Sequence, residues 1–472
     1  MMTTKEIVIV GGGITGLTTA YYLQEAIKDN QLPYKVTLIE ASDKLGGKIE
    51  TVKKQGFTIE RGPDSFLIRK EAAARLARRI GLEDQLVKNN TGKSFVLVGE
   101  SLHEIPKGSF MGIPTKLSPF MLSKMFSLKG KLRMLRDLSI SKKEAQSDQS
   151  VGEFFRYHFG NELLEHLIEP LLSGIYAGDI DQLSLMATFP QFYQMEQEYS
   201  SLIKASRQTM GQKDKKTAKK SSKFYSLKDG LESLVTQVKN QFDSSIVQVL
   251  TTTKVNHIEK KPVGYHLLLD NGEVLTADSV ALTTSVKQAQ RMFSQYDFWE
   301  QFGEMKATSV ANVAMAFDQA AIPTDIDGTG FVVSRNSDYR ITACTWTHKK
   351  WPTTTPENKA LLRCYVGKPG DEEVVNLTDE EIVAIALKDL EKIMGITAKP
   401  DFHVVTRWRD SMPQYTVGHL ERLETLSHDL DDQLPGVFVA GNSYRGIGLP
   451  DCIRQGEQVV DQIITFLDDE KR

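Results

Sequence analysis

The pattern of apolar and polar positions near the N-terminus predicts a strand, a tight turn and a helix. A β-branched run, Ile7 to Val10, stops at a cluster of glycines, and apolar residues then recur at helical spacing from Leu17 to Leu23. A second apolar run, Lys35 to Ile39, predicts another strand, which ends at Glu40. A strand, a helix and a second strand in this order predict a βαβ unit, and therefore an α/β fold with a parallel sheet.

The glycines of this turn have the spacing of a dinucleotide-binding loop. Gly11 allows the sharp turn, Gly13 lets the backbone approach a pyrophosphate, and Gly16 lets the helix pack close to the strand. The helix N-terminus adds amides and a favourable dipole, and Glu40 can hold the ribose hydroxyls. The alternative is a glycine turn in an ordinary α/β protein. The residues expected at the dinucleotide are Gly11, Gly12, Gly13, Ile14, Thr15, Gly16, Glu40 and Ala41.

The rest of the pattern predicts helices, then strands, and then a return to the first sheet. Residues 90–202 read as mainly helical, and four strand-like runs between Val310 and Gly367 predict an antiparallel sheet. Residues 378–394 then predict an amphipathic helix. A strand at 436–442 leads through a glycine loop into a final helix. The expected organisation is a cofactor domain of 1–89, 224–288 and 406–472, a helical domain of 90–206, a polar linker of 207–223 and a substrate-binding domain of 289–405.

Composition narrows the class of protein. The chain has 472 residues, 40 % of them hydrophobic and 25 % charged, which is typical of a globular protein with two or three domains. The formal net charge of −3 argues against nucleic-acid binding. No cysteine lies in a C-x-x-C pair, so we expect neither a disulfide framework nor a metal site, and a reducing cytoplasm fits best. The run from Ile7 to Leu23 is too short and too rich in glycine to span a membrane, and no export signal is expected.

Two further glycine-rich segments can reach the same cofactor. Gly46, Gly47 and Lys48 follow Glu40 closely, and a nicotinamide enzyme does not need this second patch. At the other end of the chain, a strand, a loop with Gly446 and Gly448, and a helix start can place amides at a flavin ring. The pattern therefore favours FAD over NAD.

These segments together resemble the flavin-dependent porphyrinogen oxidases, in the wider class that includes monoamine oxidases and phytoene desaturases. The most specific stretches are 60–66, 169–179 and 407–415. Within the family, the chain is similar to the coproporphyrinogen III oxidases of Gram-positive bacteria, whereas relatives elsewhere act on protoporphyrinogen IX. The resemblance implies an α/β fold with an FAD-binding Rossmann-like domain of the amine-oxidase and glutathione-reductase type, an antiparallel-sheet substrate domain and an α-helical domain.

The resemblance also implies how FAD is held. Monoamine oxidases attach the flavin to a cysteine before the last strand, and no cysteine occurs here between Arg407 and Gly441, so we expect noncovalent FAD. Trp408 is the family residue near the flavin, although a buried core tryptophan is an alternative. The further cofactor contacts implied are Gly47, Lys48, Gly62, Pro63, Asp64, Ser65, Val255, Trp408, Gly441, Ile447, Gly448 and Leu449.

The activity implied is the oxidation of coproporphyrinogen III to coproporphyrin III in haem biosynthesis. Six electrons leave in three flavin cycles, each closed by oxygen with release of hydrogen peroxide, and no catalytic side chain is required because the flavin carries the chemistry. Protoporphyrinogen IX is the alternative substrate. The same scaffold also fits an amine or carotenoid oxidoreductase, or a flavin-fold binding protein without turnover. The implied partners are the porphyrinogen, molecular oxygen and other haem-pathway enzymes that receive the product.

Candidate substrate contacts follow from the carboxylates of a porphyrinogen. Cations should meet them at the pocket mouth, and Lys70 is the first candidate; weaker ones are Arg69, Arg335 and Arg340. By resemblance, Ile175 and Tyr365 form pocket walls. The stretch from Phe110 to Leu138 mixes apolar and basic residues, which is typical either of a peripheral contact with an anionic membrane or of helices packed over a cavity.

Overall fold

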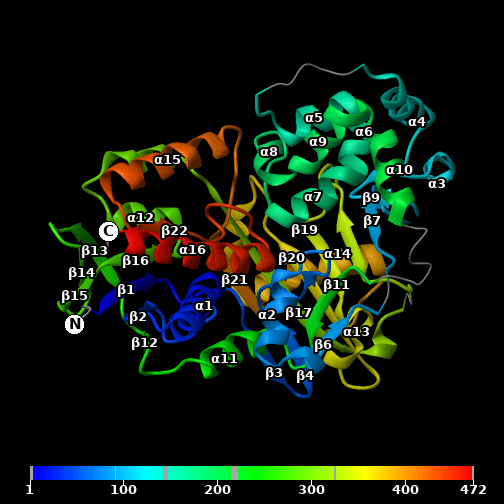
Figure 1. Cartoon of the computed structure of the whole chain (residues 1–472). Coiled ribbons are helices and arrows are strands. Elements are labelled where there is room, and N and C mark those ends of the chain that lie inside the picture. The colour runs from blue at the N-terminus through cyan, green and yellow to red at the C-terminus, as the bar shows by residue number, and fades with distance from the viewer. Residues whose placement is uncertain (1–3, 91, 142–146, 214–221, 324–325, 470–472) are drawn as a thin grey trace.

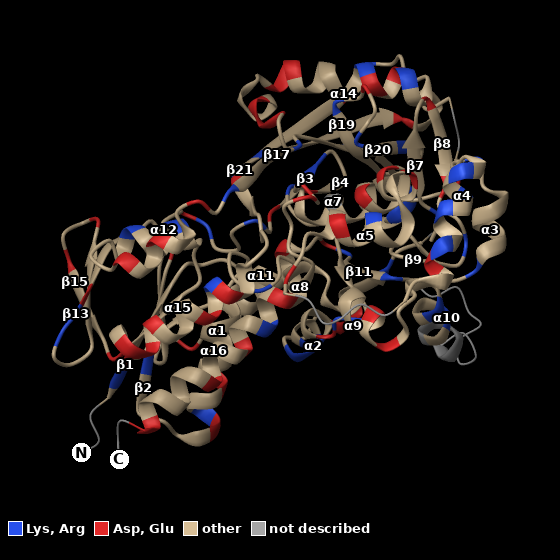
Figure 2. Ribbon diagram, turned by 90° about the horizontal axis from the view of Figure 1, so that it is seen from above, with Lys and Arg blue, Asp and Glu red and all other residues tan. Residues whose placement is uncertain are grey.

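The structure is a computed structural model that describes residues 4–90, 92–141, 147–213, 222–323 and 326–469. Figure 1 shows a parallel sheet with its helices on one side of the molecule, and a helical domain above a large mixed sheet on the other. Both termini of the described chain belong to the part built on the parallel sheet (Figures 1 and 2).

The parallel sheet confirms the βαβ unit predicted from the sequence. Its five strands lie in the order β12-β2-β1-β16-β22, and every neighbouring pair is parallel. Their bounds are Val247–Leu250, Tyr34–Ile39, Lys5–Val10, Ser279–Leu282 and Val437–Val439. Helix α1 (Ile14–Asn30) packs against the final helix α16 (Leu449–Asp469) beside this sheet. The first and last segments of the chain therefore build one region, in which the sequence predicts the cofactor domain.

Smaller elements complete this domain. The antiparallel strands β13 (Val255–Lys260), β14 (Tyr265–Leu269) and β15 (Val274–Ala277) share a core with β1 and β16. Other elements are β3 (Thr51–Lys54), β4 (Phe57–Glu60), β5 (Phe66–Leu67), β6 (Leu86–Lys88), β11 (Phe224–Leu227), α2 (Ala72–Arg79), α11 (Glu232–Asn240), α12 (Val286–Met292) and α15 (His419–Gln433).

A seven-stranded sheet forms the floor of the second half of the molecule, in the order β21-β17-β20-β19-β18-β7-β8. The four predicted strand runs are β17 (Ala307–Asp318), β18 (Gly330–Val333), β19 (Ile341–Trp346) and β20 (Lys359–Val366), and their mutual pairings are antiparallel. The predicted helix at 378–394 is α14 (Asp379–Met394), which starts with a capping box between Thr378 and Glu381 and packs on this sheet. The prediction of an antiparallel sheet with a covering helix is confirmed.

Two predicted boundaries are wrong. Residues 95–104 were expected in a helical domain, but β7 (Phe95–Val98) and β8 (Ser101–Glu104) extend the large sheet, because the apolar run from Phe95 pairs in parallel with β18. The boundary at 405/406 falls inside β21 (Phe402–Pro413), since this long strand pairs with β17 over most of its length.

The helical domain lies above this sheet (Figure 1). It contains β9 (Ser109–Phe110), β10 (Ile113–Pro114), α3 (Leu117–Leu122), α4 (Leu128–Leu135), α5 (Val151–Phe159), α6 (Asn161–Leu163), α7 (Glu169–Tyr176), α8 (Leu185–Thr188), α9 (Pro190–Tyr199) and α10 (Leu202–Lys213). Because α10 continues to Lys213, the first part of the expected 207–223 linker is helical, and residues 214–221 lie outside the described residues. Within the described chain, no helix is both long and apolar enough to span a bilayer.

Candidate functional site

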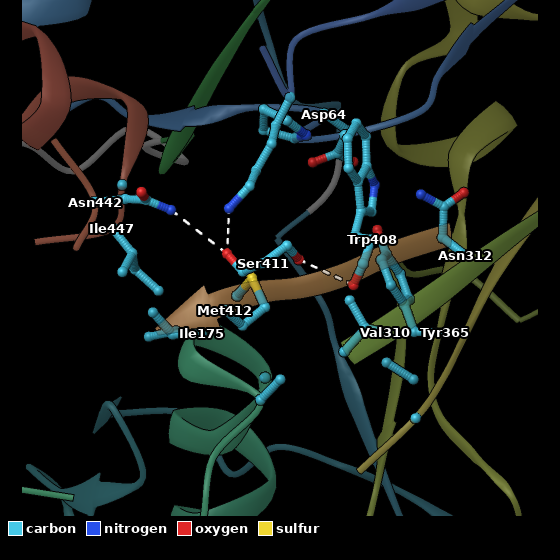
Figure 3. Close-up of a pocket in the computed structure, with 18 of the residues that line it drawn as sticks. Asp64, Ile175, Val310, Asn312, Tyr365, Trp408, Ser411, Met412, Asn442 and Ile447 are labelled. Carbon is cyan, nitrogen blue, oxygen red and sulfur yellow. Dashed lines mark hydrogen bonds between the residues drawn. The ribbon is translucent and has the colours of Figure 1, made fainter. Parts of the chain in front are cut away.

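A cavity of about 870 Å³ lies where the cofactor domain, helix α7 and the seven-stranded sheet meet. One end is formed by the glycine loops of the cofactor domain, and the other by α7 and by strands β18, β19 and β20. The cavity lining includes these residues predicted at the cofactor: Gly11, Gly13, Ile14, Thr15, Glu40, Gly47, Lys48, Gly62, Pro63, Asp64, Ser65, Trp408, Gly441, Ile447, Gly448 and Leu449. Figure 3 shows the part of the wall around Trp408, Ser411 and Ile175.

Four predicted cofactor residues do not line the cavity. Gly12 and Gly16 are close-packed, since an added Cβ would lie 2.5 Å from the Leu45 side chain and 1.9 Å from the Gly11 carbonyl oxygen, respectively. Val255 is buried in the core shared with the parallel sheet. Ala41 is exposed just beyond Glu40. None of these positions excludes a backbone contact with a bound dinucleotide, and their roles stay predictions.

The geometry of the first loop fits a pyrophosphate. A Cβ added to Gly13 would meet no atom within 4 Å, whereas one added to Gly16 would lie 1.9 Å from the carbonyl oxygen of Gly11. Gly11 itself has a φ of +111°, which L side chains rarely adopt. No side chain caps the N-terminus of α1, so its first amides are free to bind an anion. The space beside Gly13 is therefore a cradle for a ligand rather than a gap in the packing.

Glu40 is held in place at the edge of this cradle. Its carboxylate accepts hydrogen bonds from the amide of Gly12 at 2.7 Å and from the amide and hydroxyl of Ser42, both at 2.8 Å. The second glycine patch lies against the first, because the Gly46 amide donates to the Gly12 carbonyl at 2.8 Å. An acceptor at the end of β2 beside a glycine loop is what the ribose of a dinucleotide requires.

Lys48 places a buried positive charge at the glycine-rich end of the cavity. Its ammonium donates to the carbonyl of Ser411, and the side-chain amide of Asn442 points at the same oxygen at 3.5 Å (Figure 3). Burial lowers the pKa of Lys48 to about 8, since no carboxylate pairs with it among the described residues. A buried cation without a carboxylate partner favours an anionic or electron-rich ligand at this position.

The loop after β4 joins the cofactor domain to the large sheet. Gly62 is required there, because a Cβ would lie 1.7 Å from the carbonyl oxygen of Lys48. Burial alone would raise the pKa of Asp64, but Lys350 and Arg363 hold it well below its usual range. Trp408 donates from Nε1 to the Arg61 carbonyl at 3.0 Å and is part of the cavity wall, so it is not simply a buried core tryptophan.

The predicted substrate residues divide into two groups. Ile175 and Tyr365 line the cavity. Lys70 lies outside the lining and pairs with Asp451 at 2.5 Å. Arg340 pairs with Asp371 at 2.7 Å and also lies outside, as does Arg69.

Arg335 lines the cavity but is already neutralised. It contacts Glu169 at 2.9 Å and Asp179 at 3.2 Å. Although burial opposes its charge, these two carboxylates raise the pKa of Arg335. Two neighbouring acids outweigh its single positive charge, so the group as a whole is a weak anchor for an anion.

Several residues of the cavity wall were not among the site residues predicted from the sequence. Lys350 follows β19, Lys368 follows β20, and Ser411 and Met412 lie near the end of β21. None belongs to a dinucleotide-binding glycine motif, and the polar neighbours in the sequence, such as Lys349 and Asp410, do not indicate which side chain faces the cavity. Only the alternation of side chains along the strands could have indicated which of them face inward.

Much of the remaining wall is apolar. In Figure 3, Ile175, Val310, Tyr365, Met412 and Ile447 surround the space in front of Trp408. No group of three or more His, Cys, Asp or Glu residues that could hold a metal occurs in the described part of the chain. A polar glycine-rich end joined to a wide apolar chamber suits a bound cofactor with a large apolar substrate against it.

Comparison with known proteins agrees with this geometry. A family described as flavin containing amine oxidoreductase matches residues 14–464. The coproporphyrinogen III oxidase of Bacillus subtilis is 51 % identical over 98 % of both chains, and that of Staphylococcus aureus is 42 % identical over 98 % of this chain and 100 % of its own. A solved structure of a candidate protoporphyrinogen oxidase from Exiguobacterium sp. 255-15 superposes with a TM-score of 0.88 at 38 % identity, covering 99 % of this chain and 100 % of the other. The chain therefore belongs to the flavin-containing amine oxidoreductase family.

Proposed function

We propose that this protein is a cytoplasmic, oxygen-dependent coproporphyrinogen III oxidase that holds FAD without a covalent bond and releases coproporphyrin III and hydrogen peroxide. The observation that carries the proposal is one continuous cavity that joins a dinucleotide cradle to an apolar chamber. The names of relatives at 51 % and 42 % identity support the choice of substrate. The product is then handed to a later enzyme of haem synthesis.

The residues of the cradle fit FAD. In this proposal the α1 amides at Gly13 bind the pyrophosphate, Glu40 binds the adenosine ribose, and Lys48 lies near the flavin ring. When bound, the flavin accepts two electrons in each cycle and passes them to oxygen. The thiol of Cys452 lines the cavity, but burial raises its pKa to about 11, so little thiolate is present to form a covalent link.

The chain itself positions the substrate. The apolar walls bury the macrocycle and exclude water from the face of the flavin. The largely buried ion pair Lys350–Asp64 and the partly exposed ion pair Arg335–Glu169 hold the wall in one arrangement. The acidic members of both pairs are engaged with cations. We therefore assign the wall to binding and orientation, without a catalytic side chain.

We also propose a peripheral contact with an anionic membrane through helices α3 and α4. The side chains of Leu122, Leu128 and Leu132 are 83 %, 80 % and 68 % exposed, and no acidic residue occurs between Glu104 and Asp137. Figure 2 shows basic residues gathered on α4. The cations of this stretch are Lys107, Lys116, Lys124, Lys129, Lys131, Arg133 and Arg136. Exposed leucines among lysines that form no ion pair with a described residue favour anionic lipid, which takes up apolar side chains and attracts cations.

Side-by-side turnover tests the proposed activity. Coproporphyrinogen III and protoporphyrinogen IX are supplied in air, and porphyrin fluorescence is followed together with peroxide. We expect faster turnover of coproporphyrinogen III, with three peroxides for each porphyrin formed. Preference for protoporphyrinogen IX would reassign the substrate. Turnover of a simple amine with neither porphyrinogen oxidised would favour the amine oxidase alternative, and a purified protein without flavin would favour a binding protein.

A further inference from the structure

The positive charges in the cavity wall are not equivalent. Four cationic side chains line the cavity in the described structure: Lys48, Arg335, Lys350 and Lys368. Lys350 is paired with Asp64 at 2.8 Å, and Arg335 with Glu169 at 2.9 Å. Lys48 lies at the glycine-rich end, where the proposed function assigns it to the flavin. Lys368 is the one cation of the chamber that forms no ion pair with any described residue.

The acids nearest to Lys368 in the sequence are engaged elsewhere. The carboxylate of Asp371 accepts from the Arg340 guanidinium at 2.7 and 3.2 Å. The carboxylate of Glu372 accepts from the Gly370 amide at 3.0 Å. Neither carboxylate forms an ion pair with the ammonium of Lys368 in the described structure, and Asp371 is paired with Arg340 instead.

The backbone around Lys368 is fixed. Gly367 has a φ of +99°, and a Cβ there would lie 2.6 Å from the carbonyl oxygen of Ser309 on β17. The Asp371 amide closes the turn by donating to the Lys368 carbonyl at 2.9 Å. The fixed turn therefore places the half-buried Lys368 at the wall of the cavity.

A second polar group on the same wall lacks a partner. The hydroxyl oxygen of Ser337 is buried and forms no hydrogen bond with any described residue, and Ser337 lines the cavity. In the pairing of β19 with β20, Ile341 lies opposite Val366. The residues just before β19 therefore lie beside those just after β20, which brings the segment of Ser337 next to that of Lys368. A buried hydroxyl is normally hydrogen-bonded, so an unpartnered hydroxyl on the wall that also carries an unpaired cation indicates a ligand.

We infer that Lys368, with the hydroxyl of Ser337, forms a subsite for a carboxylate group of the substrate. The inference rests on the proposed function, because a porphyrinogen is an apolar macrocycle with carboxylate arms. An ammonium at the edge of an apolar chamber binds a carboxylate more strongly than one in open water, since both charges are partly removed from solvent. Lys368 thus replaces Lys70, whose charge is already paired with Asp451.

The test compares a charged and an uncharged ligand on the FAD-loaded enzyme. Binding of coproporphyrin III and of its tetramethyl ester is measured by fluorescence for the wild type, Lys368→Ala, Lys368→Arg and Ser337→Ala. Lys388→Ala is the matched control, because Lys388 is an exposed lysine of α14 outside the cavity lining. Loss of one charge-assisted hydrogen bond predicts about a 10-fold rise in the Kd of Lys368→Ala for coproporphyrin III, and a smaller rise for Ser337→Ala.

The tetramethyl ester shows how much of the binding depends on the carboxylates of the ligand, because it lacks their charge. Its Kd should change by less than about 2-fold in Lys368→Ala, since no anion is present to lose a contact, and Lys368→Arg should retain most of the affinity for the acid. Equal weakening of acid and ester would show a packing role and overturn the inference. So would an unchanged Kd for the acid. If the wild type and Lys368→Ala bind coproporphyrin III equally well, only the subsite is overturned. If the wild type neither binds coproporphyrin III nor oxidises a porphyrinogen, the proposed function and the subsite are both overturned.

Discussion

The ammonium of Lys350 lies 2.8 Å from a carboxylate oxygen of Asp64, although 286 residues separate them in the chain. Both side chains are only 13 % exposed, and the second carboxylate oxygen is 3.1 Å from the same nitrogen. Asp64 lies in the loop between β4 and β5 of the cofactor domain, and Lys350 ends helix α13 (Thr347–Lys350) beside the large sheet. The pair therefore joins the two halves of the molecule at the cavity wall.

Breaking this pair should destabilise the protein more than removing it entirely. Lys350→Met leaves the Asp64 carboxylate buried without its main partner, and we expect a loss of about 3–5 kcal/mol, which a thermal unfolding experiment reads as a lower Tm. The double variant Asp64→Asn with Lys350→Met removes both charges and should recover much of the loss. A double variant less stable than Lys350→Met would show that the pair is not coupled in this way.

Two glycines of one loop should respond differently to the same added methyl group. Gly13→Ala places a Cβ in open space, so the chain should fold normally but bind FAD at least about 10-fold more weakly, because the methyl group occupies the cradle. Gly16→Ala drives a Cβ against the Gly11 carbonyl and should reduce the yield of folded protein. Flavin content and the Tm of the flavin-free proteins separate the two effects. Normal flavin content in Gly13→Ala would move the cofactor away from this loop.

Glu60 should make stability depend on pH in a defined window. Burial raises the pKa of Glu60 from 4.5 to about 7, although the Leu231 amide and the Thr51 hydroxyl donate to its carboxylate. Between these two values the unfolded chain releases a proton that the folded chain keeps. The contribution of Glu60 to stability is therefore greatest below pH 4.5 and falls until about pH 7.

The variant Glu60→Gln tests this linkage. It has no proton to release, and relative to it the wild type should lose about 2–3 kcal/mol of stability on going from pH 4.5 to 7. The Tm values of the two proteins are compared across that range. A difference in Tm that does not change with pH would mean that Glu60 stays charged in the folded protein.

The α3–α4 surface predicts lipid-selective binding. The protein should sediment with vesicles that contain phosphatidylglycerol and not with pure phosphatidylcholine, and raising the salt should weaken binding, since screening reduces the attraction of lysines to anionic lipid. Replacing Leu122, Leu128 and Leu132 by Ser, or Lys124 and Lys129 by Glu, should each reduce the bound fraction. Val263→Ser is the control, because Val263 is 82 % exposed on a distant hairpin. An equal loss in Val263→Ser, or self-association of the wild type through these leucines, would contradict a membrane contact.

The sequence by itself determined the elements whose signals are local. The strand, glycine turn and helix at Gly11 to Gly16 can be predicted because periodicity and turn chemistry act over a few residues. The strands β17 to β20 and the helix α14 were predicted for the same reason, and the C-terminal glycine loop could be assigned to the cofactor because its strand and helix repeat the same pattern. The family followed from these motifs.

Tertiary structure alone decided the partners of each side chain. The run at Phe95 joined the large sheet because β18 offered it a free edge, and nothing within the run indicates that pairing. Lys70 and Lys368 look equivalent in the sequence, yet one is neutralised by Asp451 and the other lines the cavity without a counter-charge. Hydrophobic periodicity specifies which face of an element is buried, but whether a charge is compensated depends on groups hundreds of residues away, and these meet only when the chain has folded.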